Sequence, residues 1–250
     1  MRDHRLGFFD ASAVLFDLDG VVTPTAEVHM RAWASMFRAL FEQRAVEPPY
    51  SDDDYFRHLD GRPRYEGVAS LLASRGVEVP WGDPDDPDDA DTVCGIGNRK
   101  NAVFSRLLAD EGIAAYPGTL AVLDRLSAAG TPVAIVSSSK NAVPVLAAAN
   151  LADRFPVVVD GVVAAEAGLP GKPRPDIFLE GARRLHVDPA NAVVVEDAVS
   201  GVQAGAAGRF GLVVGVDRGA GAGELSEAGA DVVVRDLADL LSTTDEGDES

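Results

Sequence analysis

Short runs of β-branched residues alternate with helical patterns along most of the chain. We expect strands at 13–16, 132–136, 157–159, 192–195, 212–216 and 231–234. Amphipathic or alanine-rich stretches between them predict helices at 119–129, 142–150, 176–185, 199–207 and 237–241. Continuous apolar strands that alternate with helices are typical of a parallel sheet covered on both faces. The pattern therefore predicts an α/β fold with a Rossmann-like parallel sheet.

This alternation is interrupted between residues 26 and 110. A long amphipathic helix is predicted at 27–44, because apolar residues recur there at helical spacing. Further helices are expected at 52–59, 64–75 and 98–110, and no strand pattern separates them. We therefore expect an α/β core made of 1–25 and 111–250, with 26–110 as an inserted helical domain. Within the insertion, residues 81–91 contain six Asp and two Pro, which predicts an exposed, mobile loop.

Composition and charge disfavour several classes of function. A formal net charge of −18 disfavours binding to nucleic acid or to anionic membranes, both of which require clustered Lys and Arg. No apolar run approaches the roughly 18 residues of a membrane helix, and the charged N-terminus does not read as a signal peptide. The single cysteine, Cys94, favours a reducing cytoplasm. We expect a cytoplasmic monomer that acts on a small molecule.

Polar residues follow the predicted strands in four clusters. The first is Asp17-Leu-Asp19-Gly20, and the second is "SSSKN" at 137–141. The third contains Lys172 just before a predicted helix, and the fourth is Glu196-Asp197. Each cluster alone can be explained by helix capping or a turn. Ligands of open α/β sheets bind beyond the carboxyl ends of strands, so the four together indicate a site.

The carboxylates of these clusters indicate a metal. Acidic groups beside a hydrophobic strand repel one another, and a cation offsets this cost. Hard oxygen ligands without His or Cys favour Mg²⁺ over zinc. Binding an anion to so acidic a protein requires local cations, and only three of the 22 basic residues are Lys. The three are Lys100, Lys140 and Lys172.

The four clusters, in this order, resemble the haloacid dehalogenase superfamily. The stretch "DLDGVVTPT" (17–25) resembles the first motif of this superfamily. Further stretches resemble its β-phosphoglucomutase subfamily: "TAEVHMRAW" (25–33), "GRPR" (61–64), "NRKN" (98–101), "YPG" (116–118), "SSSKN" (137–141) and "KPRPDIF" (172–178). The resemblance extends over essentially the whole chain. It implies that the helical insertion is a cap domain on an α/β core.

The resemblance also implies catalytic roles. Asp17 is expected to be the nucleophile that forms an aspartyl-phosphate, and Asp19 the general acid and base. Ser137 and Lys172 would hold the transferring phosphoryl group. The implied Mg²⁺ ligands are Asp17, Asp19, Glu196 and Asp197. Relatives that are dehalogenases lack the second carboxylate, so Asp19 argues for phosphate esters.

The implied substrate-binding residues lie in both domains. They are Gly20, Thr25, His29, Trp33, Gly61, Arg62, Arg64, Lys100, Ser138, Ser139, Lys140 and Asn141. Arg64 matches the cap arginine that grips the non-reacting phosphate of a sugar bisphosphate, a task suited to a bidentate fork. Packing of the cap against its own core is the other explanation for Trp33.

The leading functional hypothesis is a Mg²⁺-dependent mutase. It would interconvert β-glucose 1-phosphate and glucose 6-phosphate through β-glucose 1,6-bisphosphate. A sugar-phosphate phosphatase remains an alternative, because Pro24 and Ser138 depart from the mutase pattern. A non-catalytic sugar-phosphate sensor is disfavoured, because every catalytic position is filled.

Overall fold

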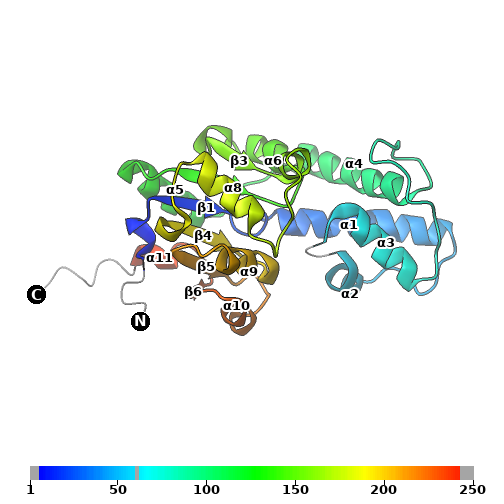
Figure 1. Cartoon of the computed structure of the whole chain (residues 1–250). Helices are drawn as coiled ribbons and strands as arrows, with labels where there is room; N and C mark the ends of the chain where they lie inside the picture. The colour runs from blue at the N-terminus through cyan, green and yellow to red at the C-terminus, as the bar shows by residue number, and fades with distance from the viewer. Residues whose placement is uncertain (1–5, 60–61, 243–250) are drawn as a thin grey trace, which may run out of the picture. The chain divides into compact units, whose positions relative to one another are not determined.

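The structure is a computed structural model that describes residues 6–59 and 62–242 (Figure 1). The chain divides into two compact units. Unit 1 comprises Met1–Thr25 and Ile113–Ser250, and unit 2 comprises Ala26–Gly112. Unit 2 is thus inserted into unit 1, and the chain crosses between the units after Thr25 and after Gly112.

Unit 1 contains a six-stranded sheet in which every neighbouring pair is parallel. Its spatial order is β3-β2-β1-β4-β5-β6. The strands are β1 (Ala13–Phe16), β2 (Val133–Val136), β3 (Val157–Val159), β4 (Ala192–Glu196), β5 (Leu212–Val216) and β6 (Val232–Val234). The predicted α/β fold is confirmed, and β-branched runs located all six strands to within one residue at each end.

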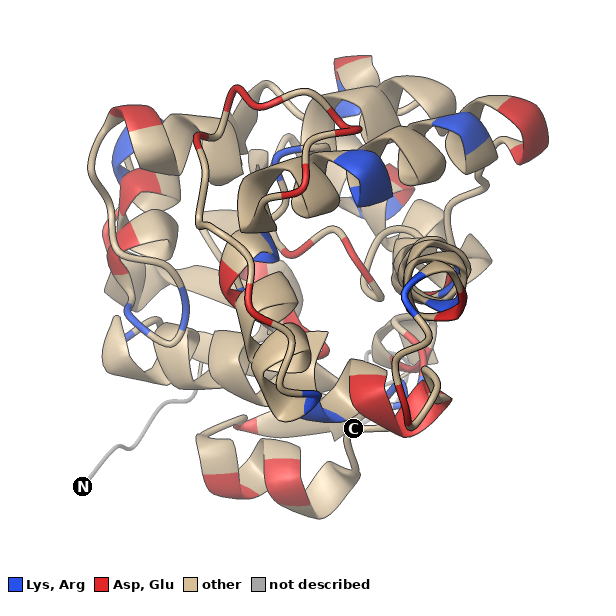
Figure 2. Cartoon of the chain, turned by 90° about the vertical axis from the view of Figure 1, so that its right-hand side faces the viewer, with Lys and Arg blue, Asp and Glu red and all other residues tan. Residues whose placement is uncertain are grey.

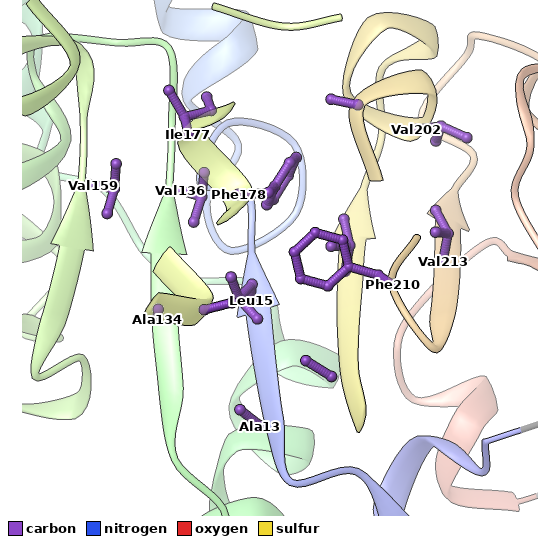
Figure 3. Packing of buried hydrophobic residues seen from close by; sticks show 14 of the residues in the cluster. Ala13, Leu15, Ala134, Val136, Val159, Ile177, Phe178, Val202, Phe210 and Val213 are labelled. Carbon is purple, nitrogen blue, oxygen red and sulfur yellow. The ribbon is translucent and has the colours of Figure 1, made fainter. Parts of the chain in front are cut away.

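One face of the sheet is covered by α8 (Asp176–Arg184), α9 (Val199–Ala207) and α10 (Ala222–Ala228). Figure 3 shows Leu15 from the central strand packed with Phe178 and Phe210. The two phenylalanine rings meet edge-on at 6.0 Å between centroids, a favoured aromatic geometry. A Cβ at Gly181 would lie 2.8 Å from Leu15 Cδ2, so the glycine lets α8 approach β1 closely.

Alternate strand residues face the opposite side of the sheet. Val14 and Phe16 are fully buried there, and Phe16 meets Phe155 edge-on at 6.2 Å. The remaining helices that bury apolar residues in unit 1 are α5 (Pro117–Ala129), α6 (Ala142–Ala148) and α11 (Asp239–Ser242). Three short 3₁₀ turns, η1 (Phe8–Asp10), η3 (Ala152–Arg154) and η4 (Pro189–Asn191), precede β1, β3 and β4. The sheet is thus buried on both faces, which fixes the position of the residues that follow its strands.

Two helices of unit 1 were not predicted from the sequence. They are α7 (Gly161–Glu166) and α10. The first has two valines, which favour a strand, directly after Gly161, but Asp160 accepts bonds from the N–H groups of Val162 and Val163 and caps a helix. Helix α10 follows a glycine-rich loop, and the glycines around its first turn gave no helical signal in the sequence. The predicted helix at 237–241 is observed as α11, two residues later.

The regular elements among the described residues of unit 2 are all helical, with loops between them. Its elements are α1 (Thr25–Gln43), α2 (Asp52–Asp54), the π-helical turn η2 (Tyr55–Leu59), α3 (Arg64–Ser74) and α4 (Val93–Glu111). Phe37, fully buried, stacks on Trp33 and Tyr50 in the core of this unit. No helix among the described residues combines the length and apolarity needed to span a membrane.

Two boundaries in unit 2 differ from the prediction. The helix expected at 52–59 is a short α-helix that continues as a π-helical turn. The last helix begins at Val93, five residues earlier than the expected 98, because the hydroxyl of Thr92 accepts a bond from Gly95 N–H at 2.9 Å. Glycines at 95 and 97 made this first turn look unlike a helix.

The acidic segment 81–91 is mostly exposed, as predicted, and contains neither helix nor strand. Side chains of α4 and its cap bind it. Asn98 donates to the carbonyl of Asp86 at 2.8 Å, and Arg99 donates to the carbonyl of Asp88 at 2.7 Å. Thr92 donates to the Asp86 carboxylate at 2.6 Å. These bonds attach the segment to one helix, whereas its mobility stays a prediction.

The ion pair of Asp54 and Arg75 lies buried in unit 2, with both side chains less than 10% exposed and 2.7 Å apart. The pKa of Asp54 is lowered, because hydrogen bonds from Ser51 and Arg75 outweigh the effect of burial. We predict that Arg75→Met lowers the free energy of unfolding by about 3 kcal/mol, since it strands a buried charge. Arg57→Met is the control, because Arg57 pairs with Asp53 on the surface at 3.9 Å.

Urea denaturation at pH 7 compares the two variants with the parent. The control should cost about 1 kcal/mol or less. Equal losses for both variants would contradict a stabilising role for the buried pair.

Candidate active site

Three carboxylates meet at the carboxyl ends of β1 and β4. Asp17 follows β1, Glu196 ends β4, and Asp197 comes next. The two strands are neighbours in register, with Phe16 opposite Val195, and Asp17 N–H donates to the Val195 carbonyl at 2.9 Å. One oxygen of each carboxylate lies within 4.8 Å of the others, close enough to hold one metal ion. Such a set of hard oxygen ligands suits a divalent cation of the Mg²⁺ or Ca²⁺ type.

Lys172 inserts its ammonium between these carboxylates. Nζ lies 2.5 Å from Asp17 Oδ1 and 2.5 Å from Glu196 Oε1, and it donates to the Val136 carbonyl at 3.1 Å. The side chain is 6% exposed. Burial alone would lower the pKa of Lys172, but the charges and hydrogen bonds of Asp17 and Glu196 raise it above its usual value. The lysine is therefore a permanently charged partner of both acids.

Glu196 and Asp197 have raised pKa values. Burial raises the pKa of Glu196, and the charge of Asp17 adds to this against the opposing effect of Lys172. Burial also raises the pKa of Asp197, with the charges of Glu196, Asp17 and Asp19 adding to it. Glu196 is held by the N–H groups of Asp197 and Ala198, both 3.1 Å from Oε2. The cluster thus carries more negative charge than Lys172 neutralises, which favours a bound cation.

Asp19 lies beside this cluster but is not among the three carboxylates that converge. Its Oδ1 accepts a hydrogen bond from the hydroxyl of Thr25. Thr25 in turn shares a hydrogen bond with Thr23 at 3.1 Å, and both threonines are fully buried. Gly20 has a positive φ of 86°, and a Cβ there would lie 1.9 Å from Asp197 Oδ2. Only glycine fits this turn, which brings Asp19 next to Asp197.

The second cluster follows β2. Ser137 is 1% exposed, and its hydroxyl accepts a bond from Ser139 N–H at 3.0 Å. The backbone of Ser137 also donates to Val159 O at 3.0 Å, continuing the sheet. Asn141 is buried, whereas Ser138 and Lys140 are exposed and contact none of the three converging carboxylates in the described bonds. The structure thus brings Asp17, Lys172, Glu196 and Asp197 together and leaves these two side chains in solvent.

In unit 2, the buried Lys100 and the half-buried His29 form a pair beside aromatic rings. Lys100 is 3% exposed, and its Nζ lies 2.5 Å from His29 Nδ1. The same ammonium lies 4.9 Å from the ring centroid of Trp33 and 5.0 Å from that of Phe104, in cation–π range. His29 stacks on Phe104 at 4.1 Å. Removal from water, followed by the charges of Lys100 and Arg64, lowers the pKa of His29 well below its usual value.

Arg64 is the second cation of interest in unit 2. It donates to Asn101 Oδ1 at 2.8 Å and lies over the ring of Tyr65. Arg62 is exposed, and Gly61 lies outside the described residues. Figure 2 shows basic residues scattered among more numerous acidic ones along the ribbon. Arg64 is half-buried among these charges.

Several residues around these clusters were missed from the sequence. Thr23 was not singled out, although its spacing of two from Thr25 was a usable signal. Asn101 was quoted in a motif but not assigned to the site. Phe104 lies one helical turn after Lys100, and this spacing could have indicated the contact. Gly201 left no signal at all, although a Cβ there would lie 1.8 Å from Glu196 Oε1.

Sequence comparison identifies the class of protein. A family model described as a haloacid dehalogenase-like hydrolase matches residues 11–209. The chain belongs to this haloacid dehalogenase-like hydrolase family. The β-phosphoglucomutase of Mycobacterium bovis is 49% identical over 239 residues, which cover 92% of this chain and 91% of that protein.

Two further similar proteins are a mutase and a phosphatase by name. A crystal structure of β-phosphoglucomutase from Clostridium difficile matches 94% of this chain and 96% of that chain, with a TM-score of 0.75 and 27% identity. Hexitol phosphatase A of Escherichia coli is 31% identical over 235 residues, which cover 92% of this chain and 93% of that protein. The predicted superfamily, the likeness to β-phosphoglucomutase and the assignment as an enzyme are confirmed.

The lowered pKa of His29 predicts a pH-dependent stability. The unfolded ring binds a proton below about pH 6.5, whereas the folded ring resists it, so stability is lost as pH falls from 6.5 toward the folded pKa. The slope contributed by His29 is at most about 1.4 kcal/mol per pH unit. Urea unfolding at pH 7.5 and 5.5 should show a smaller decrease in His29→Gln than in the parent. An identical decrease in both proteins would remove His29 as the source.

Proposed function

We propose that this chain is a Mg²⁺-dependent β-phosphoglucomutase, which interconverts β-glucose 1-phosphate and glucose 6-phosphate. The observation that carries this proposal is the cluster in which Lys172 bridges Asp17 and Glu196 at the carboxyl edge of the sheet. The choice of substrate rests on the 49% identity to a β-phosphoglucomutase across nine-tenths of both proteins. The cytoplasmic location and monomeric state remain predictions.

The convergence of three carboxylates supports a bound metal. Asp17, Glu196 and Asp197 would hold Mg²⁺, and Asp19 is the further ligand expected from the sequence. When bound, the ion supplies positive charge that offsets repulsion between the carboxylates and the transferring phosphoryl group. The raised pKa values of Glu196 and Asp197 support this assignment, because burial and then the neighbouring carboxylates make their negative charge costly, a cost that a bound cation would offset.

Asp17 is the proposed nucleophile. Its Oδ1 accepts a hydrogen bond from Lys172 Nζ, which holds the carboxylate in place. One carboxylate oxygen attacks phosphorus, and the P–O bond to the sugar oxygen breaks, which leaves an aspartyl-phosphate. Lys172 and the hydroxyl of Ser137 would hold the oxygens of the phosphoryl group during this step.

Asp19 is the proposed general acid and base. It protonates the sugar oxygen as the P–O bond breaks and removes the proton from the hydroxyl that attacks next. Phosphorylated Asp17 donates its group to the 6-hydroxyl of β-glucose 1-phosphate, which gives the 1,6-bisphosphate. Asp17 then accepts the 1-phosphate, which releases glucose 6-phosphate. The bond from Thr25 shows that Asp19 has a hydroxyl partner that can orient it.

Unit 2 is proposed to act as the cap domain that the family resemblance implies. Reorientation of a bisphosphate requires an anion site for the phosphate that is not reacting. Arg64 and Lys100 are suited to this role, with a guanidinium fork and a buried ammonium. His29, Trp33, Arg62 and Gly61 are the other proposed substrate residues of this unit.

A sugar-phosphate phosphatase is the second candidate. The 31% identity to hexitol phosphatase A favours it, because the same core chemistry becomes hydrolysis when water attacks the aspartyl-phosphate. Pro24 and Ser138 are departures from the mutase pattern that keep this candidate in view. The core clusters serve both reactions, so the product decides between them.

Phosphorus NMR of the purified protein tests the proposal directly. With Mg²⁺, β-glucose 1-phosphate and a trace of β-glucose 1,6-bisphosphate, we expect glucose 6-phosphate to accumulate. Inorganic phosphate as the sole product would establish the phosphatase. Asp17→Asn should abolish both reactions and labelling of the protein by phosphate donors, because the amide is a poor nucleophile. Activity that persists in this variant or after removal of Mg²⁺ would contradict the mechanism.

Arg64→Ala tests the second anion site. We predict a loss of about thirtyfold in kcat/KM for the mutase reaction, since one charge-assisted contact is worth about 2 kcal/mol. Hydrolysis of a simple aryl phosphate should change little, because that substrate has no second phosphate. Arg106→Ala, an exposed position on α4, is the control. Comparable losses on both substrates would remove Arg64 from this site.

A further inference from the structure

Arg218 lies outside the four clusters, yet its side chain reaches the turn that contains Asp19. It follows β5, and the adjacent Asp217 fixes the loop from which it extends. The Asp217 backbone donates to Val234 O at 2.8 Å, and its carboxylate accepts bonds from Gly219 and Gly221, each at 3.0 Å. The Arg218 side chain is 23% exposed. It is therefore a largely buried cation on a fixed loop.

The guanidinium of Arg218 joins three separate parts of unit 1. Nε donates to the carbonyl of Gly20 at 2.9 Å, and Nη1 donates to the carbonyl of Arg235 at 3.1 Å. Nη2 lies 3.5 Å from Asp236 Oδ2. The face of the guanidinium lies 3.9 Å from the centroid of the Tyr116 ring. A planar fork is needed to make these contacts at once, and a lysine could replace only one of them.

Tyr116 and Gly20 belong to the two stretches by which the chain passes between the units. We call residues 20–25 the first crossing segment and residues 113–117 the second. Tyr116 N–H donates to Val22 O at 3.0 Å, and the hydroxyl of Thr119 donates to Val21 O at 2.8 Å. Three consecutive carbonyls, at 20, 21 and 22, thus each receive a bond from elsewhere in unit 1. Arg218 supplies the bond nearest to Asp19.

Close packing shows that this arrangement is built into the fold. A Cβ at Gly118 would lie 1.7 Å from Asp236 Oδ1, so the first turn of α5 lies directly against the acid that neighbours Arg218. The same carboxylate oxygen accepts a bond from Ala238 N–H at 2.9 Å. On its other side, the Gly20 backbone lies against Asp197. Gly20 is therefore held between a carboxylate of the proposed metal site and the guanidinium of Arg218.

We propose that Arg218 is a positioning residue for the acid and base of the reaction. It anchors the Gly20 carbonyl, and through this turn the backbone of Asp19, and it ties the first crossing segment to the second by stacking on Tyr116. This inference rests on the proposed function for its catalytic consequence. The anchoring itself is a property of the fold and can be measured separately.

The expected catalytic effect follows from geometry. A displacement of about 1 Å in a reacting group costs up to about a hundredfold in rate, because proton transfer requires close approach. Loss of the Arg218 anchor should therefore lower kcat by about ten- to a hundredfold. The KM for β-glucose 1-phosphate should change by less than about threefold, because in this proposal Arg218 acts through the turn at Gly20 rather than on the substrate.

The experiment compares Arg218→Ala and Arg218→Lys with Arg235→Ala. Arg235 is the matched control, since its exposed side chain leaves while its carbonyl remains to accept the bond from Arg218. Amide hydrogen exchange by mass spectrometry follows peptides that cover 18–25 and 113–119, and steady-state kinetics give kcat and KM. Added guanidinium ion should restore part of the activity of Arg218→Ala.

In Arg218→Ala we expect faster exchange in both peptides, a lower kcat and a nearly unchanged KM, with a partial loss in Arg218→Lys. Arg235→Ala should match the parent. Unchanged exchange in both peptides of the Arg218 variants would overturn the anchoring, and a kcat equal to that of the parent would overturn the positioning role. If the alanine variant does not fold, the lysine variant gives the same readings. A parent that transfers no phosphoryl group would refute the proposed function, while the exchange data still decide on the anchor.

Discussion

The structure depends on the concentration of carboxylates at one edge of a buried sheet. Because β1 and β4 are neighbours in register, Asp17 and Glu196 must lie side by side where the strands end. Without a cation, this pair would be too costly to bury. The ammonium of Lys172, 2.5 Å from each acid, makes the arrangement possible, and the carboxylate of Asp197 adds further negative charge beside it. The burial of neighbouring carboxylates, which alone would destabilise the fold, is thus also the feature that characterises the candidate site.

The chain contains only three lysines, and two of them are buried. Lys172 and Lys100 are both buried, each against acids or aromatic rings, whereas Lys140 is exposed beside the second cluster. The exposed cations are mostly arginines, which form surface ion pairs such as Arg31 with Glu111. A compact ammonium fits a closed space that a guanidinium fork would overfill. Two of the three lysines thus occupy buried positions with specific partners, whereas the functional role of all three stays a prediction.

Sequence patterns predicted the sheet well and the site in part. β-Branched runs located the strands, since short continuous runs of such residues favour buried strands over other elements. The four clusters could be recognised because each directly follows or precedes an element. Residues that act through backbone carbonyls, such as Arg218 and Thr119, could not be found this way. Their partners lie about 100 or more positions away along the chain, and a carbonyl acceptor leaves no mark on residue type. The helix α7 was missed for a related reason, because the two capping bonds that Asp160 accepts outweighed the strand propensity of two valines.

Mutase and phosphatase chemistry share the core clusters, so the distinction must arise from how water and the second hydroxyl compete for the aspartyl-phosphate. In the proposed mechanism this competition depends on Asp19, because Asp19 would activate whichever nucleophile is present. Its carboxylate is bonded to Thr25, at the point where the first crossing segment enters α1. Its backbone turn is anchored on the opposite side by Arg218. The position of the base is thus coupled to the geometry of the crossing segments. A base that becomes competent only when these segments adopt their catalytic arrangement would spare the phosphoenzyme from water, which is the property a mutase requires and a phosphatase does not.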